Sequence, residues 1–337
     1  MTLSQQTNTS AGTDSPSRAG RLRTLRKTGG SGTTPVASGR SRPPGGRRGR
    51  GMTPPWWFVV PGLLFYGYIV IVPSIRGGAY AFTDWTGLGT HFDWIGWKNF
   101  RDILDDDAAR SAIGNTLVLG LVVTLGQLVL GLLLALGVHA RVKSRLVLRV
   151  LFFAPVVITP LVAGFVWQYL LSPTGSLNAF FKAVGLVSWQ QDWLGDPQLA
   201  LWSVCAVLIW QHTGITMSIF LAGLQSVPQD VLEAAHLDGA GAFRRFWYVV
   251  RPFLFPALTV NVSLTVISAL KQFDVVMVMT GGGPGNATDT ISTLIYKDAF
   301  NLGQFSYSVA LALVLTVFVM VISGLQYTFL NRAGRSS

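Results

Sequence analysis

The sequence has little charge and almost no cysteine. Only 12% of its 337 residues are Asp, Glu, Lys or Arg, whereas about a quarter of a soluble globular domain is charged. This shortage, together with a mean hydropathy of +0.45, excludes an ordinary soluble domain and indicates a membrane protein. The single cysteine, Cys205, lies inside an apolar run. It can form no disulfide within the chain, and we interpret it as a small buried residue and not as a nucleophile.

The net charge of +11 does not indicate nucleic-acid binding, because ten of the 26 basic residues are crowded into positions 1–55. That stretch is rich in Ser, Gly, Pro and Arg and has almost no large apolar side chains. It therefore predicts a disordered basic cytoplasmic tail over 1–52, which can contact anionic membrane lipid. A second short cytoplasmic tail is expected over 333–337.

Six apolar stretches are long enough to cross a bilayer, which takes about 20 residues of helix. Backbone groups in lipid must be paired within their own segment, so each stretch is predicted to be a helix. The stretches are Trp56–Ala81, Thr116–Val138, Val147–Leu171, Leu199–Leu221, Phe253–Met279 and Tyr307–Phe329. We therefore predict an all-α integral membrane protein with a six-helix transmembrane domain over 53–332.

The distribution of Lys and Arg predicts the orientation. With the amino terminus inside, nineteen basic residues fall in cytoplasmic segments and six in outer segments. Positively charged loops are retained on the cytoplasmic side. Both termini are therefore predicted to be cytoplasmic, in the cytoplasmic membrane of a bacterial cell.

One cytoplasmic segment, residues 226–252, has the pattern of two helices joined by a turn. Pro228 suits the first turn of a helix, and Ser226 suits its cap. This first helix is predicted to end near Leu237, and Gly239 supplies the turn because glycine accepts positive φ.

The second helix of this segment is predicted to begin at Ala240. Its apolar residues recur at helical spacing, as Phe243, Phe246, Trp247 and Val250. Such a stripe must pack against the membrane domain of this chain or against another subunit.

The first helix holds the only glutamate of the chain, Glu233, next to Ala234 and Ala235. An isolated carboxylate beside small side chains can make a charge-assisted hydrogen bond to an arginine of another protein. The alternative is an incidental glutamate on a helix that only connects two spans.

The segment resembles the EAA loop of ABC importer permeases. That pattern is EAA, three residues, Gly, nine residues and Ile-x-Leu-Pro, and this chain departs from it at Arg251, where Leu is usual. In the family the loop is a coupling helix that lies in a groove of an ATPase subunit. The resemblance implies an ATPase-coupling role for six residues, Glu233, Ala234, Ala235, Asp238, Gly239 and Ala240.

A second resemblance indicates which kind of importer permease the chain is similar to. Thr280–Pro284 reads TGGGP and is followed by Ala287-Thr288, Tyr296 and Ala299-Phe300, which resembles an outer-loop signature of carbohydrate permeases of the maltose, lactose and glycerol-phosphate type. It implies the type I (MetI-like) permease fold and the first of two non-identical permeases. The implied partners are the second permease, a pair of ATPase subunits, an extracellular solute-binding protein and a sugar. This subunit would bind no cofactor and do no covalent chemistry, with ATP and Mg on the ATPase.

Four polar residues of the fifth stretch, Asn261, Thr265, Ser268 and Gln272, recur on one helical face. Polar side chains inside a membrane helix are costly and commonly face a cavity or a partner helix. We expect this face to line the path of the solute, the alternative being contacts that join helices.

Three further residues are candidates for the same path. In the fourth stretch Trp210 offers an aromatic surface to a sugar, and Thr213 offers a hydroxyl. Lys271 adjoins the polar face and is predicted to form a structural ion pair with Asp274, three residues on.

Other functions remain open. A permease for a non-sugar solute, such as a glycerol phosphodiester, would share these features. An ion-coupled secondary transporter would need a titratable group within the membrane, for which only Lys271 and Asp274 are candidates. The histidines show no metal-ligand spacing, so no metal site and no catalytic site are predicted.

Overall fold

A computed structural model describes residues 56–139 and 144–335. The chain divides into two units, Met1–Trp56 and Trp57–Ser337. Only Trp56 of the first unit is described, and everything below concerns the second. The tail predicted over 1–52 therefore lies outside the described residues, as do positions 336 and 337.

The described residues form helices and no named strand; a single bridge joins Thr83 and Trp94. Five helical segments are long and apolar enough to cross a membrane: Val59–Tyr80, Asp107–His139 (α4), Ala200–Gln225 (α8), Ala242–Leu270 and Phe305–Leu330. The last belongs to α14, Phe305–Arg335. Five of the six predicted spans are thus confirmed as helices, with shifted ends.

The first span is composite. It consists of α1 (Val59–Tyr66), a π-helical turn over Gly67–Ile71 and α2 (Val72–Tyr80). None of its residues is buried within the chain. An apolar helix that is exposed on all sides is typical of contact with lipid or with another subunit.

The third predicted span is broken in the middle. Its two halves, α5 (Arg145–Val157) and α6 (Pro160–Leu170), meet at a 97° bend. Pro160 disfavours helical backbone at Thr159, which is extended with ψ 144°. The Ile158 carbonyl at the break accepts a hydrogen bond from Gln211 Nε2 of α8, at 3.0 Å. One side chain thus satisfies a backbone group that the bend leaves unpaired.

The fifth span is displaced relative to the prediction. Its helix begins at Ala242, passes through α10 (Ala242–Arg245) and a π-helical turn (Phe246–Val250), and continues as α11 (Arg251–Leu270). It ends at Leu270 and not at Met279, because the chain turns there before the separate helix α12 (Asp274–Met279). The second cytoplasmic helix and the fifth span are therefore one continuous helix.

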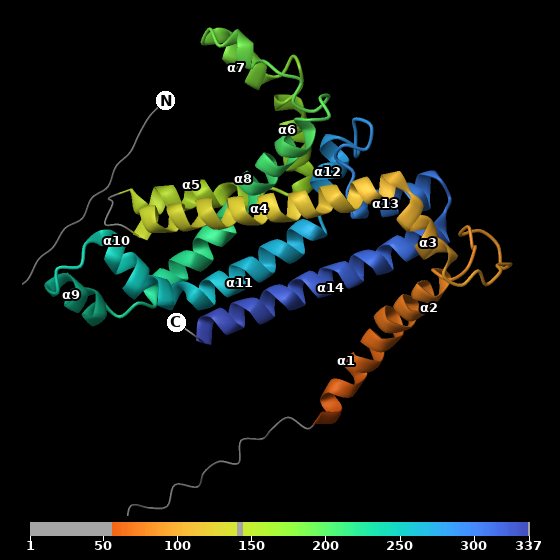
Figure 1. Cartoon of the computed structure of the whole chain (residues 1–337), viewed down its shortest axis with the longest axis horizontal. Coiled ribbons are helices and arrows are strands. Elements are labelled where there is room, and N and C mark those ends of the chain that lie inside the picture. The colour runs from red at the N-terminus through yellow and green to blue at the C-terminus, as the bar shows by residue number, and fades with distance from the viewer. Residues whose placement is uncertain (1–55, 140–143, 336–337) are drawn as a thin grey trace, which may run out of the picture. The chain divides into compact units, whose positions relative to one another are not determined.

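The core is formed by α4, α8 and α11, with α5 packed against α8 and α12 against α6 (Figure 1). Glycines allow these helices to approach closely. A side chain at Gly131 of α4 would overlap Thr216 of α8, and one at Gly214 of α8 would overlap the Phe152 carbonyl of α5. Small residues at such contacts replace the hydrophobic driving force that is absent between helices in lipid.

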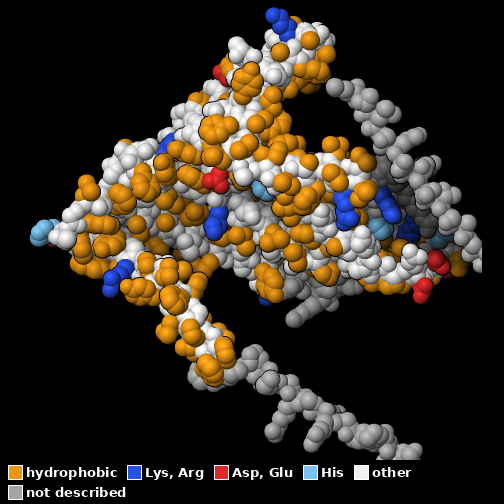
Figure 2. All heavy atoms as spheres, turned by 180° about the vertical axis from the view of Figure 1, so that it is seen from behind, with side chains coloured by type: hydrophobic (Ala, Val, Ile, Leu, Met, Phe, Trp, Pro, Cys, Tyr) orange, Lys and Arg blue, Asp and Glu red, His pale blue; other side chains and the backbone are white. Residues whose placement is uncertain are grey.

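The exposed surface is mainly apolar. Figure 2 shows hydrophobic side chains over most of the visible face, with few charged ones. Exposed apolar residues occur along α4, α5 and α14, for example Leu121, Leu151 and Phe329. This surface agrees with a multi-pass membrane protein.

Candidate functional site

A hollow lies between the three core helices, α4, α8 and α11. All four residues of the predicted polar face line it, although Gln272 lies beyond the end of α11. Its walls combine these amides and hydroxyls with aliphatic side chains and with one titratable residue, His212. The lining residues are Val123, Gln127, Leu208, His212, Ile215, Thr216, Ile219, Asn261, Leu264, Thr265, Ser268, Ala269 and Gln272.

Asn261 connects two walls of this central hollow. Its Nδ2 donates to the Thr216 carbonyl of α8 at 3.3 Å, and it is 1% exposed. Its Oδ1 is buried and finds no hydrogen-bond partner among the residues that the structure describes. The Thr265 hydroxyl donates to the Asn261 carbonyl at 2.9 Å. Asn261 therefore joins helices and also keeps one acceptor oxygen available to a ligand, so both interpretations of the polar face apply to it.

Gln127 and His212 line the same hollow, and the sequence analysis did not select them. Gln127 Nε2 lies 3.3 Å and His212 Nδ1 3.2 Å from the Leu208 carbonyl. A carbonyl only accepts, so the histidine contact is a hydrogen bond when Nδ1 carries the proton, which leaves Nε2 as an acceptor. The signal for Gln127 was a polar residue in the middle of a long apolar helix.

The other three candidates do not line the central hollow. Trp210 packs edge-to-face on Trp167, with ring centroids 5.3 Å apart. Thr213 is buried, and its hydroxyl donates to the Ile209 carbonyl within α8. Both side chains support helix packing in this structure.

Lys271 is exposed and follows the end of α11. The ion pair predicted with Asp274 is wrong, since the two ion pairs found within 56–139 and 144–335 are Arg110–Asp107 and Lys297–Asp289. The prediction assumed a continuous helix across 271–274, and the chain turns at that point.

A second hollow lies where the segment 226–252, predicted to be cytoplasmic, meets the ends of α4 and α8. The predicted first helix is α9 (Gln229–Leu237), which ends where the sequence indicated. Glu233 lines this hollow together with His139, Leu224, His236 and Arg245. The carboxylate of the only glutamate thus lies at the junction of the segment and the membrane helices.

The turn after α9 is a Schellman motif. Gly239 has φ +73°, its N–H donates to the His236 carbonyl, and the Ala240 N–H donates to the Ala235 carbonyl. The start of α9 differs from the prediction. Pro228 is itself the N-cap residue, and the Ser226 hydroxyl donates to the Gly223 carbonyl and does not cap α9.

The segment 226–252 exposes apolar side chains. None of the residues of α9 is buried, and Leu237 is 87% and Phe243 79% exposed. Phe246 and Val250 pack on the core, so only half of the predicted stripe faces this chain. Trp247 stacks on Phe243. An exposed apolar surface of this kind marks a contact with another protein or with lipid.

Arg251, where the sequence departs from the family pattern, lies over the Trp247 ring, with its guanidinium carbon 4.6 Å from the ring centroid. This cation–π contact stabilises the exposed tryptophan on the continuous helix. The substitution therefore has a local partner and leaves the second helix intact.

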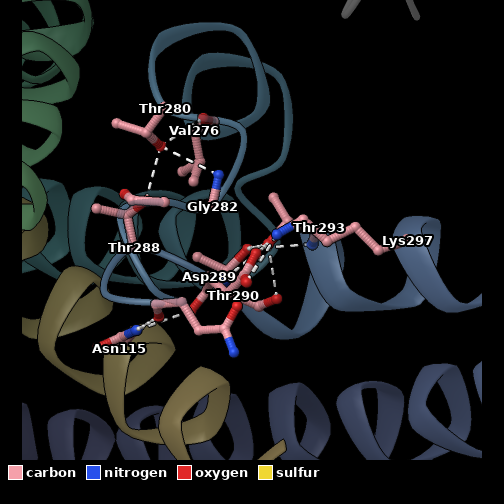
Figure 3. A network of polar contacts seen from close by, with 11 residues as sticks. Asn115, Val276, Thr280, Gly282, Thr288, Asp289, Thr290, Thr293 and Lys297 are labelled. Atoms are coloured by element: carbon pink, nitrogen blue, oxygen red, sulfur yellow. Dashed lines mark hydrogen bonds and ion pairs between the residues drawn. The ribbon is translucent and has the colours of Figure 1, made fainter. Parts of the chain in front are cut away.

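At the opposite end of α4 the loop after α12 forms a polar network (Figure 3). Asp289, 1% exposed, accepts from Lys297 Nζ at 2.8 Å and from the Thr293 hydroxyl at 3.0 Å. Asn115 of α4 donates to the Asp289 carbonyl at 3.0 Å. Thr290 caps α13 (Ile291–Tyr296) in a capping box with Thr293. The TGGGP loop is thereby fixed to α4.

A third hollow, of about 950 Å³, adjoins this network. It is lined by carboxylates from four places in the chain: Asp102 of α3 (Lys98–Asp105), Asp106, Asp289 and Asp298. Burial, with nearby Asp106 and Asp289, raises the pKa of Asp298 to about 6. Sequence analysis missed this acidic hollow, because Asp102 and Asp106 are more than 180 positions away from Asp289 and Asp298 and no spacing connects the two pairs.

Comparison with known proteins gives a consistent picture. The family described as binding-protein-dependent transport system inner membrane component matches residues 127–335. The multiple sugar-binding transport system permease protein MsmF of Streptococcus mutans is 34% identical over 80% of this chain and 93% of its own length. The sn-glycerol-3-phosphate transport system permease protein UgpA of Agrobacterium fabrum is 33% identical over 74% of this chain and 84% of its own length.

A solved structure of a bacterial ABC transporter involved in the import of the acidic polysaccharide alginate superposes with a TM-score of 0.71 at 21% identity, and covers 83% of this chain and 94% of that one. The fold predicted for an ABC importer permease is confirmed by this likeness. With its apolar helices and its match over residues 127–335, the chain belongs to the family of binding-protein-dependent transport system inner membrane components.

Proposed function

We propose that this chain is the permease subunit of an ABC importer for a sugar or oligosaccharide, and that the central hollow is part of the solute path. Both termini are cytoplasmic in this proposal, as the Lys and Arg distribution favours. A second permease, a pair of ATPase subunits and an extracellular solute-binding protein complete the complex. ATP and Mg are bound by the ATPase subunits, and this chain makes and breaks no covalent bonds.

The observation that carries the sugar assignment is the chemistry of the central hollow. Its polar groups are amides, hydroxyls and one imidazole, and neither a carboxylate nor a Lys or Arg lines it. Neutral donors and acceptors such as Gln127, Asn261 and Gln272 suit the hydroxyl groups of a sugar. Aliphatic walls at Ile215 and Leu264 suit its C–H faces.

A non-sugar solute such as a glycerol phosphodiester is the second candidate, because one relative is named for transport of a related phosphate ester, sn-glycerol-3-phosphate. A phosphate group carries negative charge, and anions are usually bound by Arg, Lys or a helix N-terminus. The central hollow offers only His212 as a titratable group. Its lining therefore favours the neutral solute.

An ion-coupled carrier fits less well. Its coupling group was expected at Lys271 and Asp274, and neither residue lines the central hollow. Both also lie in the short turn between α11 and α12. The family, moreover, is described as binding-protein-dependent.

Coupling to the ATPase is assigned to the exposed α9 and its Schellman turn. Glu233 lines the hollow at the end of α4, and the helix that follows the turn runs without a break to the central hollow. A force applied to α9 would thus reach the wall that carries Asn261, Thr265 and Ser268. In this mechanism the closing ATPase pair changes the relative affinity of the inward and outward states for the solute.

The test uses the whole complex, reconstituted in proteoliposomes with ATP inside. Ser268→Trp fills the central hollow and is expected to abolish uptake of radiolabelled maltooligosaccharides, while the ATPase still copurifies. Glu233→Lys is expected to release the ATPase or to uncouple its hydrolysis from uptake. Asp105→Lys, an equal charge reversal at an exposed position of α3, is the control and should leave copurification unchanged. ATP-independent uptake by the chain alone, or wild-type uptake in Ser268→Trp, would refute the proposal.

A further inference from the structure

The acidic hollow has an excess of negative charge that the chain does not neutralise. Four carboxylates and one ammonium group line it, and that ammonium, Lys297 Nζ, is already paired with Asp289 at 2.8 Å. Asp102, Asp106 and Asp298 remain. None of these three takes part in an ion pair with a described residue.

Asp298 shows most clearly that a partner is missing. It is 5% exposed, and its Oδ2 is buried without any hydrogen-bond partner among the described residues. Burying a carboxylate without pairing it is costly, so such groups normally face a cation or hold a proton. The side chain lines the acidic hollow, where an entering group could supply that partner.

Asp106 lines the same hollow as Asp298, and two hydrogen bonds fix its orientation. The Tyr307 hydroxyl donates to Asp106 Oδ2 at 2.7 Å, and the Ala108 N–H donates to Oδ1 at 2.8 Å. A carboxylate has about four acceptor positions, so two remain after these bonds. The neutral Tyr307 hydroxyl thus fixes the orientation of Asp106 and does not neutralise its negative charge.

The shape of the site favours a side chain over a metal ion. No group of three or more metal-ligating residues with suitable geometry occurs in the part of the chain that the structure describes. The hollow, about 950 Å³, has room for a long basic side chain. It lies at the amino-terminal end of α4, the end away from Glu233, which is the outer end in the proposed orientation.

We propose that the acidic hollow receives a lysine or arginine side chain of the extracellular solute-binding protein, paired with Asp298 and Asp106. The inference rests on the proposed function, since it requires a binding protein that docks on the outer side. Charge-assisted pairing of this kind would fix the docked orientation and make docking sensitive to salt.

The test measures docking directly. The assembled transporter in lipid nanodiscs is immobilised, and the probe is the purified solute-binding protein that stimulates ATP hydrolysis by the wild-type complex. Asp298→Asn is expected to weaken its affinity about tenfold or more. Asp107→Asn is the matched control, because Asp107 is an exposed acid at the start of α4 that lies outside the hollow and pairs with Arg110. It should retain wild-type affinity.

Two further readouts separate a docking contact from a merely structural role. Wild-type affinity should fall with added salt and as the pH drops below about 6, where Asp298 becomes protonated. The groups around the Asp298 carboxyl are Asp102, Asp106, Asp289, Lys297 and Tyr307, and all of them remain in Asp298→Asn. Because the variant removes only the Asp298 carboxyl, its affinity should lose the pH dependence and part of the salt dependence. Equal affinities of Asp298→Asn and Asp107→Asn would overturn the inference. If no solute-binding protein stimulates the wild-type complex, the proposed function itself fails.

Discussion

Gly282 lies so close to Asp289 that a Cβ at Gly282 would overlap the Asp289 carboxylate and crowd Lys297 Nζ. The backbone of Gly282 also has φ +87°, a conformation that residues with a side chain rarely adopt. The loop thus contains a glycine where a buried ion pair occupies the neighbouring space. Gly282 therefore has a structural reason in this loop.

Gly282→Ala is therefore expected to displace Asp289 or Lys297 and to lower stability by about 1–3 kcal/mol. Thermal unfolding of the detergent-purified protein, followed by tryptophan fluorescence, measures the loss. Gly281→Ala is the control, since Gly281 has φ +59° but open space around it. It reports backbone strain alone, and an equal loss in both variants would contradict the steric argument.

Lys297→Met removes the partner of a carboxylate that is 1% exposed. Breaking a buried pair from one side costs about 3–5 kcal/mol, because the remaining charge is left unpaired. The double variant Lys297→Met with Asp289→Asn is expected to lose less than the single one, since it leaves no buried charge. Chemical unfolding of the three proteins measures these differences, and a double variant that is less stable than the single would disprove the explanation.

The stability of the protein should depend on pH through Asp298. Burial raises its pKa to about 6, whereas the ordinary value is 3.8. Between these values the folded state holds more protons than the unfolded state, so stability decreases as the pH rises from about 4 to about 6. Above this window the deficit is up to about 3 kcal/mol.

Asp298→Asn removes the titrating group and should raise the melting temperature at pH 7.5 while leaving it nearly unchanged at pH 4. Melting curves of wild type and variant from pH 4 to pH 8 provide the measurement. Asp107→Asn, at an exposed site, serves as the control. Parallel pH profiles of wild type and Asp298→Asn would exclude Asp298 as the source.

Gln211→Leu tests the junction of α5 and α6. Without the Gln211 amide the Ile158 carbonyl loses its 3.0 Å partner at the bend. We expect a loss of about 1 kcal/mol, the usual size for an interhelical hydrogen bond in membranes, measured as a lower melting temperature. Gln225→Leu, an exposed change at the end of the same helix, should have no such effect.

The elements that could be predicted are those marked by the spacing of apolar residues or by a residue that ends a helix. Apolar runs identified the long helices, and Gly239 marked the end of α9 because a Schellman turn needs a residue that accepts positive φ. The polar face of α11 was visible because Asn261, Thr265 and Ser268 share one side of a regular helix. The gathering of these residues at the central hollow agrees with the expectation, and their contact with a solute stays a prediction.

What failed was any inference that assumed a helix where the chain turns. The chain is apolar on both sides of Thr159, so an apolar count could not reveal a 97° bend. The same assumption produced the ion pair of Lys271 and Asp274. Contacts such as the hydrogen bond between Tyr307 and Asp106 could not be predicted from the sequence, because they join segments about 200 positions apart.

The unbroken helix from Ala242 to Leu270 has a mechanical consequence. Asn261 lies nineteen residues beyond Ala242, about 28 Å along one rod. Turning such a rod at its Ala242 end rotates every polar group on its far half together. In the proposed importer, solute release and contact with the ATPase would then both depend on the rotation of this one helix, and neither could change without the other.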